Sequence, residues 1–175
     1  MIDNQYIHEL DIDLDFSYII ELVKKNQYKI IDGMASHHRK VSDDEYMTYV
    51  REKYPCLSQT YNIYTMQPGI GLPMHIDARR SCAFNIPISG TDDSYTIFYE
   101  PVKDLTFDFD PVKIYNVITS EVVETFRYTL TRPVLINNSG PHRVDVKGSN
   151  DRVILSWSAS PEFNFEQTKV FFKNS

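Results

Sequence analysis

The amino-acid sequence predicts a mainly β fold, a sandwich or barrel of antiparallel strands preceded by helices. Aromatic residues are abundant, with 12 Tyr and 10 Phe, whereas Gly is scarce at 6 residues, and this bias favours strands. From residue 59 onward the chain breaks into short β-branched and aromatic segments, separated by turn sequences such as QPGIG, SGTDDS and KGSND. That alternation is typical of an all-β sandwich or barrel and not of a βαβ sheet.

Residues 1 to 58 are expected to form a helical segment that supports the β part. In DFSYIIELVKKNQ, four apolar side chains recur at helical spacing, with Asp15 placed as a cap and two lysines in the last turn. The apolar positions are Phe16, Ile19, Ile20 and Val23. A second helix is expected in VSDDEYMTYVREKYP, where Ser42 and Glu45 match a capping box and Pro55 ends the helix.

The segment DGMASHHRKV between the two helices is interpreted as a loop, in which adjacent histidines are usually solvated. Six strands are then expected, in QTYNIYTM, SCAFNIPI, SYTIFYE, VVETFRYTL, PVLINN and RVILSWS. The less regular KDLTFDFDPVKIYN is interpreted as an insertion or a long loop. With 175 residues and no internal repeat, the chain is expected to be a single domain whose β core covers residues 59 to 160.

Composition narrows the classes of function and location. The net charge of −6 and the pI near 5.3 disfavour a protein that binds a nucleic-acid backbone. Cys56 and Cys82 stand in unrelated contexts, so no disulfide framework is implied. The acidic start MIDNQYIHELDIDLDF is unlike a signal peptide, and no apolar run approaches the roughly 18 residues needed to span a bilayer. We therefore expect a cytoplasmic protein without a membrane partner.

A candidate metal site begins in the stretch GLPMHIDARR, which contains His75 and Asp77. In a strand, residues i and i+2 point to the same side, and their Cα atoms lie roughly 6.6 Å apart. Both side chains can then converge on one ion. By itself the pair is better explained by coincidence on a polar strand end.

His142 and Arg152 extend this pattern. His142 is the only histidine after His75, and two His with one carboxylate hold iron(II) while leaving positions open. The alternative is a turn histidine that caps a strand. Arg152 shares a strand face with Ile154 and Ser156. A buried Arg needs an anionic partner, and its planar fork suits a small dicarboxylate; the alternative is a surface arginine beside a turn.

Taken together, PGIGLPMHID, His142 and Arg152 resemble the iron(II)- and 2-oxoglutarate-dependent oxygenases, whose motif is His-x-Asp, a distal His and a basic residue about ten positions further on. The resemblance covers residues 59 to 160 and implies a double-stranded β-helix, a jelly roll of the cupin-like type. It also implies that His75, Asp77 and His142 bind Fe(II), that Arg152 pairs with the distal carboxylate of 2-oxoglutarate, and that molecular oxygen is the co-substrate. The implied reaction is hydroxylation of a C–H bond with release of succinate and carbon dioxide.

The finer resemblance is divided among branches of the family. The Pro68-Gly69 pair before the first His looks like the prolyl hydroxylase-like proteins and the AlkB-like nucleic-acid demethylases. The run NNSGPHRV is similar to aspartyl/asparaginyl hydroxylase-like proteins, which often lack the carboxylate ligand that Asp77 supplies here. Many members carry Arg-x-Ser at the co-substrate site, whereas this chain has Ile154 in the Ser position.

Four further residues are candidates around this site. Tyr64 and Asn85 lie on strands that flank the metal pair, and either could hydrogen-bond a carboxylate of 2-oxoglutarate; the alternatives are a core tyrosine and an asparagine at the barrel edge. Arg79 and Arg80 are expected near the mouth, where one contacts substrate or both are solvated.

Two other classes of function stay open. One is a cupin-type metalloenzyme that does not use 2-oxoglutarate, although such sites usually have more His ligands. The other is a non-catalytic jelly-roll module for binding or sensing. A small molecule or a protein side chain is the expected substrate, a nucleic acid is disfavoured, and the sequence leaves the oligomeric state open.

Overall fold

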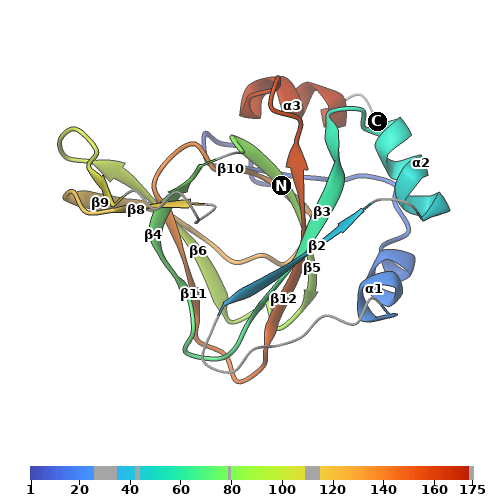
Figure 1. The fold of residues 1–175 in the computed structure, drawn as a ribbon, viewed down its shortest axis with the longest axis horizontal. Coiled ribbons are helices and arrows are strands. Elements are labelled where there is room, and N and C mark those ends of the chain that lie inside the picture. Colours follow the sequence, from blue (N-terminus) through green and yellow to red (C-terminus); the bar gives the residue numbers. More distant parts are fainter. Residues whose placement is uncertain (26–34, 42–43, 79, 109–114, 174–175) are drawn as a thin grey trace.

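The computed structural model describes residues 1–25, 35–41, 44–78, 80–108 and 115–173, and two facing antiparallel sheets form its centre (Figure 1). The strands are β1 (Ile7–Glu9), β2 (Ser36–Val41), β3 (Leu57–Met66), β4 (Leu72–Asp77), β5 (Cys82–Ser89), β6 (Ser94–Pro101), β7 (Phe107–Asp108), β8 (Tyr115–Ile118), β9 (Val122–Tyr128), β10 (Val134–Asn137), β11 (His142–Val146) and β12 (Arg152–Ala159). The helices are α1 (Phe16–Lys25), α2 (Glu45–Lys53) and α3 (Phe165–Lys173).

The strand order defines a jelly roll. The sheet that we call the major sheet has the order β1-β10-β5-β12-β3-β2, and the minor sheet has the order β7-β8-β4-β11-β6-β9. Consecutive strands β3, β4, β5 and β6 alternate between the sheets, and so do β9, β10, β11 and β12. Eight strands wound in this way form the double-stranded β-helix that cupins also use. The predicted fold class is therefore confirmed.

The strand β12 explains how the core is divided. Its residues Val153, Leu155 and Trp157 belong to an apolar cluster that includes buried residues of all three helices, so the helices cover the outer face of the major sheet. Ile154 points the other way, into a second cluster between the sheets with Tyr64. Because the strand is buried on both faces, apolar side chains occur on both of them.

The two predicted helices are present. The Asp15 carboxylate accepts a hydrogen bond from the backbone N–H of Tyr18 at 3.0 Å, and α1 buries Ile19 and Val23, as expected. The helix α2 is capped by Asp44, whose side chain accepts from two backbone N–H groups in the first turn. The predicted cap was therefore wrong by two residues, and Ser42 itself lies outside the described residues.

Several elements differ from the prediction because their partners are distant in sequence. Residues 36–41, expected to be a loop, form the edge strand β2 against β3. The segment expected to be an insertion or a long loop, residues 103–116, contains β7 and the start of β8, and these strands extend the minor sheet beyond β4; residues 109–114 lie outside the described part. The sequence also did not predict β1, which pairs with β10, or α3. An existing sheet edge stabilises a strand that local propensity alone does not specify.

Two further observations concern the cysteines and the helices. Cys56 and Cys82 are both free and buried, and burial raises the pKa of each thiol to about 12. Within the described residues, no helix combines the length and the apolar character needed to cross a membrane.

Gly71, which precedes β4, is required by a close approach of two backbones. A Cβ atom at this position would lie 2.1 Å from the carbonyl oxygen of Val144 on β11. We expect Gly71→Ala to lower the free energy of unfolding by about 1–3 kcal/mol, because the strands must separate. Urea denaturation measures the change. Gly140→Ala is the control, since nothing lies within 4 Å of its added Cβ; equal stability of the two variants would contradict the close approach.

Candidate metal centre

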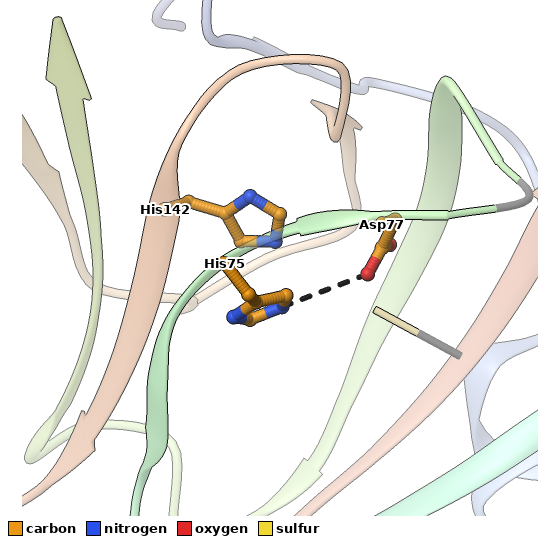
Figure 2. Close-up of side chains that lie close together, drawn as sticks. All are labelled: His75, Asp77 and His142. Carbon is orange, nitrogen blue, oxygen red and sulfur yellow. Dashed lines mark ion pairs between the residues drawn. The ribbon is translucent and has the colours of Figure 1, made fainter. Parts of the chain in front are cut away.

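Two neighbouring strands of the minor sheet bring the predicted triad together (Figure 2). His75 and Asp77 lie on β4, and His142 is paired with His75 across the β4–β11 ladder. The imidazole rings lie 4.3 Å apart between centroids. Potential ligand atoms of the three residues all lie within 4.8 Å of one another. In the described part of the chain, this is the one cluster of at least three His, Cys, Asp or Glu side chains that converges in this way.

Backbone carbonyls orient both imidazoles. Nδ1 of His75 lies 2.6 Å from the carbonyl oxygen of Pro73, and Nδ1 of His142 lies 3.0 Å from that of Gly140. A carbonyl only accepts hydrogen bonds, so each Nδ1 carries a proton, and Nε2 is the nitrogen through which each imidazole could bind a ligand. Nε2 of His75 lies 3.6 Å from Oδ1 of Asp77. Such fixed tautomers are typical of metal-binding histidines.

The electrostatics of the triad suit a cation. Burial, together with the neighbouring His75, lowers the pKa of His142 to about 4, so this imidazole is neutral at neutral pH. Burial is the largest single influence and would raise the pKa of Asp77, but the charge of Arg80 and the smaller effects of the neighbouring His75 and His142 together hold that pKa below its usual range. The site thus offers a neutral imidazole and an ionised carboxylate, the protonation states that metal ligands require.

Arg80 lies inside the fold and contacts Asp77. Its Nε donates to Oδ2 of Asp77, and its Nη1 donates to Oγ of Ser156 at 2.8 Å. Its guanidinium lies 5.3 Å from the centre of the Tyr64 ring. The side-chain amide of Asn138 donates to the same Oδ2. The expectation of a solvated arginine is therefore wrong for Arg80, because a buried carboxylate draws it inward.

Arg79 lies outside the described residues. The contact between Asn138 and Asp77 was missed by the sequence prediction, which singled out neither Asn138 nor a partner for Oδ2. An asparagine in a polar turn four residues before His142 carries no distinctive signal. Only the packing of the loop before β11 against β4 makes it a neighbour of the metal triad.

Arg152, the first residue of β12, is buried between the sheets with only 2% of its surface exposed. Its Nε donates to Oγ of Ser94 at 3.0 Å, whereas its Nη1 is buried without a hydrogen-bond partner among the described residues. Burial lowers the pKa of Arg152 to about 10. The alternative of a surface arginine is excluded. The predicted face shared by Arg152, Ile154 and Ser156 points into the fold, where Ser156 contacts Arg80.

Tyr64 and Asn85 lie on the same inner face of the major sheet. Tyr64 is paired with Ile154 and is 8% exposed, and it packs in the cluster that also contains Phe98. Asn85 is paired with Ser156, and its Oδ1 is buried without a partner among the described residues. Asn62, which the sequence prediction missed, pairs with Ser156 from the other side. Its Oδ1 is also buried without a partner among the described residues. The roles of Tyr64 and Asn85 in ligand binding stay predictions.

The fold and the triad together define the class of this chain: a jelly-roll protein with a buried His-Asp-His cluster. No protein-family model matches the sequence, and no curated protein matches it either. Solved structures of low sequence identity do match. One is oxalate decarboxylase from Bacillus subtilis at pH 4.6, with 14% identity, a TM-score of 0.42, and coverage of 78% of this chain and 28% of that chain.

Two vicilin structures match in a similar way. Vicilin from Corylus avellana (hazelnut) has 11% identity and a TM-score of 0.40, covering 74% of this chain and 29% of that one. Vicilin from Capsicum annuum has 10% identity and a TM-score of 0.44, covering 79% and 31%. This chain therefore spans less than a third of the length of each. At TM-scores this low, the fold assignment rests on the strand order described above.

Proposed function

We propose that this chain is an iron(II)- and 2-oxoglutarate-dependent dioxygenase. It would hydroxylate a C–H bond of a small molecule or a protein side chain, with release of succinate and carbon dioxide. The observation that carries the proposal is the buried guanidinium of Arg152, which has no anionic partner among the described residues and lies between the same two sheets as the triad.

The triad fits iron(II). Two imidazole nitrogens and one carboxylate oxygen on one face of the ion form the facial triad of non-haem iron oxygenases, which leaves positions for a co-substrate and oxygen. Here His75, Asp77 and His142 would hold the metal. When bound, the iron and the 2-oxo acid would supply the oxidising power, since decarboxylation of the acid accompanies the activation of oxygen.

Arg152 fits the distal carboxylate of 2-oxoglutarate. The guanidinium of Arg152 contacts Ser94 at the start of β6. His142 pairs with Phe98, which lies four residues further along the same strand. Four residues span roughly 13 Å of strand. An inward-pointing arginine side chain and a five-carbon diacid would bridge that gap together. The carboxylate would satisfy the unpaired Nη1 with a charge-assisted hydrogen bond.

The remaining residues would shape the chamber. Phe98 and Ile154 line the space between the two sheets and would keep water from the co-substrate. The neutral imidazole of His142 would bind the metal without releasing a proton. Tyr64 and Asn85 stay our candidates for hydrogen bonds to a 2-oxoglutarate carboxylate.

The test is the visible charge-transfer band that an iron(II)–2-oxoglutarate chelate produces. Under anaerobic conditions, we expect the band only when both iron(II) and 2-oxoglutarate are present. Succinate, which lacks the 2-oxo group needed for chelation, is the control and should give no band. Admission of oxygen should then convert 2-oxoglutarate to succinate. Folded, iron-loaded protein without a band would contradict the proposal.

A second candidate is a cupin-type metalloenzyme that does not use 2-oxoglutarate, since the triad alone would also suit other divalent metals. A non-catalytic jelly-roll module is the third. The three candidate functions differ in what they imply for Arg152, because only the dioxygenase provides a dicarboxylate that pairs with its guanidinium. Metal binding without a charge-transfer band would favour the second, and absence of both would favour the third.

The composition and the two cysteines support a proposal for the location and the partners of the protein. Two free, buried cysteines suit a reducing compartment, and we propose the cytoplasm. A net charge of −6 disfavours a nucleic-acid substrate.

A further inference from the structure

The two carboxylate oxygens of Asp77 face different partners. Oδ1 lies 3.6 Å from Nε2 of His75, on the side where the ligand atoms of the triad converge. Oδ2 accepts two hydrogen bonds, one from Nε of Arg80 and one from the side-chain amide of Asn138. The carboxylate therefore offers the metal one oxygen and keeps the other engaged with the protein.

Arg80 is itself fixed by the opposite sheet. Its Nη1 donates to Ser156 on β12 at 2.8 Å, and its guanidinium stacks over the ring of Tyr64 on β3 at 5.3 Å from the centroid. Both strands belong to the major sheet, whereas Asp77 ends β4 of the minor sheet. Arg80 thus links the carboxylate to a part of the fold that carries none of the three ligands.

We propose that Arg80 is a positioning residue of the metal centre. It holds Oδ2 away from the ion, so that Asp77 binds through Oδ1 alone. A carboxylate that bound through both oxygens would occupy one of the positions that a co-substrate needs, and the partners of ligand side chains commonly set such orientations. The inference rests on the proposed function only in requiring that the triad binds a divalent metal.

The chemistry of arginine suits this role better than that of lysine. The planar guanidinium carries donors in fixed directions, and here two of them reach partners on different sheets. A lysine ammonium is a point charge on a flexible stem, so it keeps the charge without fixing both partners. With Nε and Nη1 both engaged, Arg80 acts on the reaction through Asp77.

The experiment measures metal binding without 2-oxoglutarate. Anaerobic titrations of Arg80→Met with iron(II) and with cobalt(II) should show affinity reduced about 10- to 100-fold, the usual cost of losing a partner of a ligand. The visible spectrum of the cobalt form should also change, because Oδ2 of Asp77 then keeps only the hydrogen bond from Asn138 and can approach the metal. Arg80→Lys should fail to restore the wild-type affinity or spectrum.

Arg143→Met is the matched control. Arg143 directly follows the ligand His142 and forms an ion pair with Asp145 at 2.8 Å, but it is half-exposed and no ligand of the triad is its partner. We expect wild-type metal affinity for this variant. Ser156→Ala is the milder test if Arg80→Met does not fold: it removes only the anchor of Nη1 and should shift the cobalt spectrum in the same direction.

Each result decides the inference. Wild-type affinity and spectrum in folded Arg80→Met would overturn it, as would full rescue by Arg80→Lys or an equal loss in Arg143→Met. A wild-type protein that binds neither metal would overturn both this inference and the proposed function. An Arg80 effect on metal binding without a 2-oxoglutarate band in the wild type would support the inference and reject only the dioxygenase.

Discussion

Arg152→Met is expected to weaken 2-oxoglutarate binding strongly while iron(II) binding persists. The guanidinium is buried, and Oγ of Ser94 is the acceptor that it contacts. Loss of one partner from a buried, hydrogen-bonded charge pair costs roughly 2–5 kcal/mol, or about 30- to 5,000-fold in affinity. Anaerobic titration of the charge-transfer band measures this loss.

The same substitution should leave the free energy of unfolding unchanged or raise it. In the absence of co-substrate, the fold carries a desolvated cation without a counter-ion among the described residues, and burying such a charge opposes folding. Urea denaturation without 2-oxoglutarate tests this point. Arg132→Met, at an exposed position before β10, is the control for the substitution itself. Retention of wild-type 2-oxoglutarate affinity by Arg152→Met would contradict the assigned role.

His142→Ala and Asp77→Ala are both expected to abolish iron(II) binding, but they should differ in the stability of the metal-free protein. Removal of Asp77 leaves the partly buried Arg80 without its carboxylate, and breaking a buried ion pair costs about 3–5 kcal/mol. His142 is neutral, with its pKa lowered to about 4 by burial, so its removal leaves no charge unpaired. We expect the smaller loss of stability for His142→Ala.

Metal titration and urea denaturation in a chelator separate these two effects. His8→Ala is a useful control, since His8 pairs with Asp3 near the amino terminus and is not part of the triad. Its metal affinity should equal that of the wild type. Equal stability of the two ligand variants would show that the ion pair between Asp77 and Arg80 contributes nothing, and iron binding by His142→Ala would reject the triad.

Much of the architecture could be predicted from local patterns. The apolar repeat of α1 and the cap at Asp15 follow from helical geometry. Most of the strands of the jelly roll follow from β-branched and aromatic runs between turns. The convergence of His75 and Asp77 follows from the two-residue period of a strand. In each case the interacting residues are close in sequence, so local geometry suffices.

The tertiary structure decided what depends on contacts between distant segments. The strand β2 exists because it pairs with an edge of β3, although its own sequence indicates a loop. Arg80 looks solvated in the sequence prediction, yet Asp77 and Ser156 on opposite sheets hold it inside. Asn138 becomes a partner of Asp77 only when β11 lies beside β4. The sequence by itself determined which residues can bind a metal. Packing of the two sheets decided which residues hold those ligands in place, because the buried carboxylate of Asp77 requires hydrogen-bond donors around it.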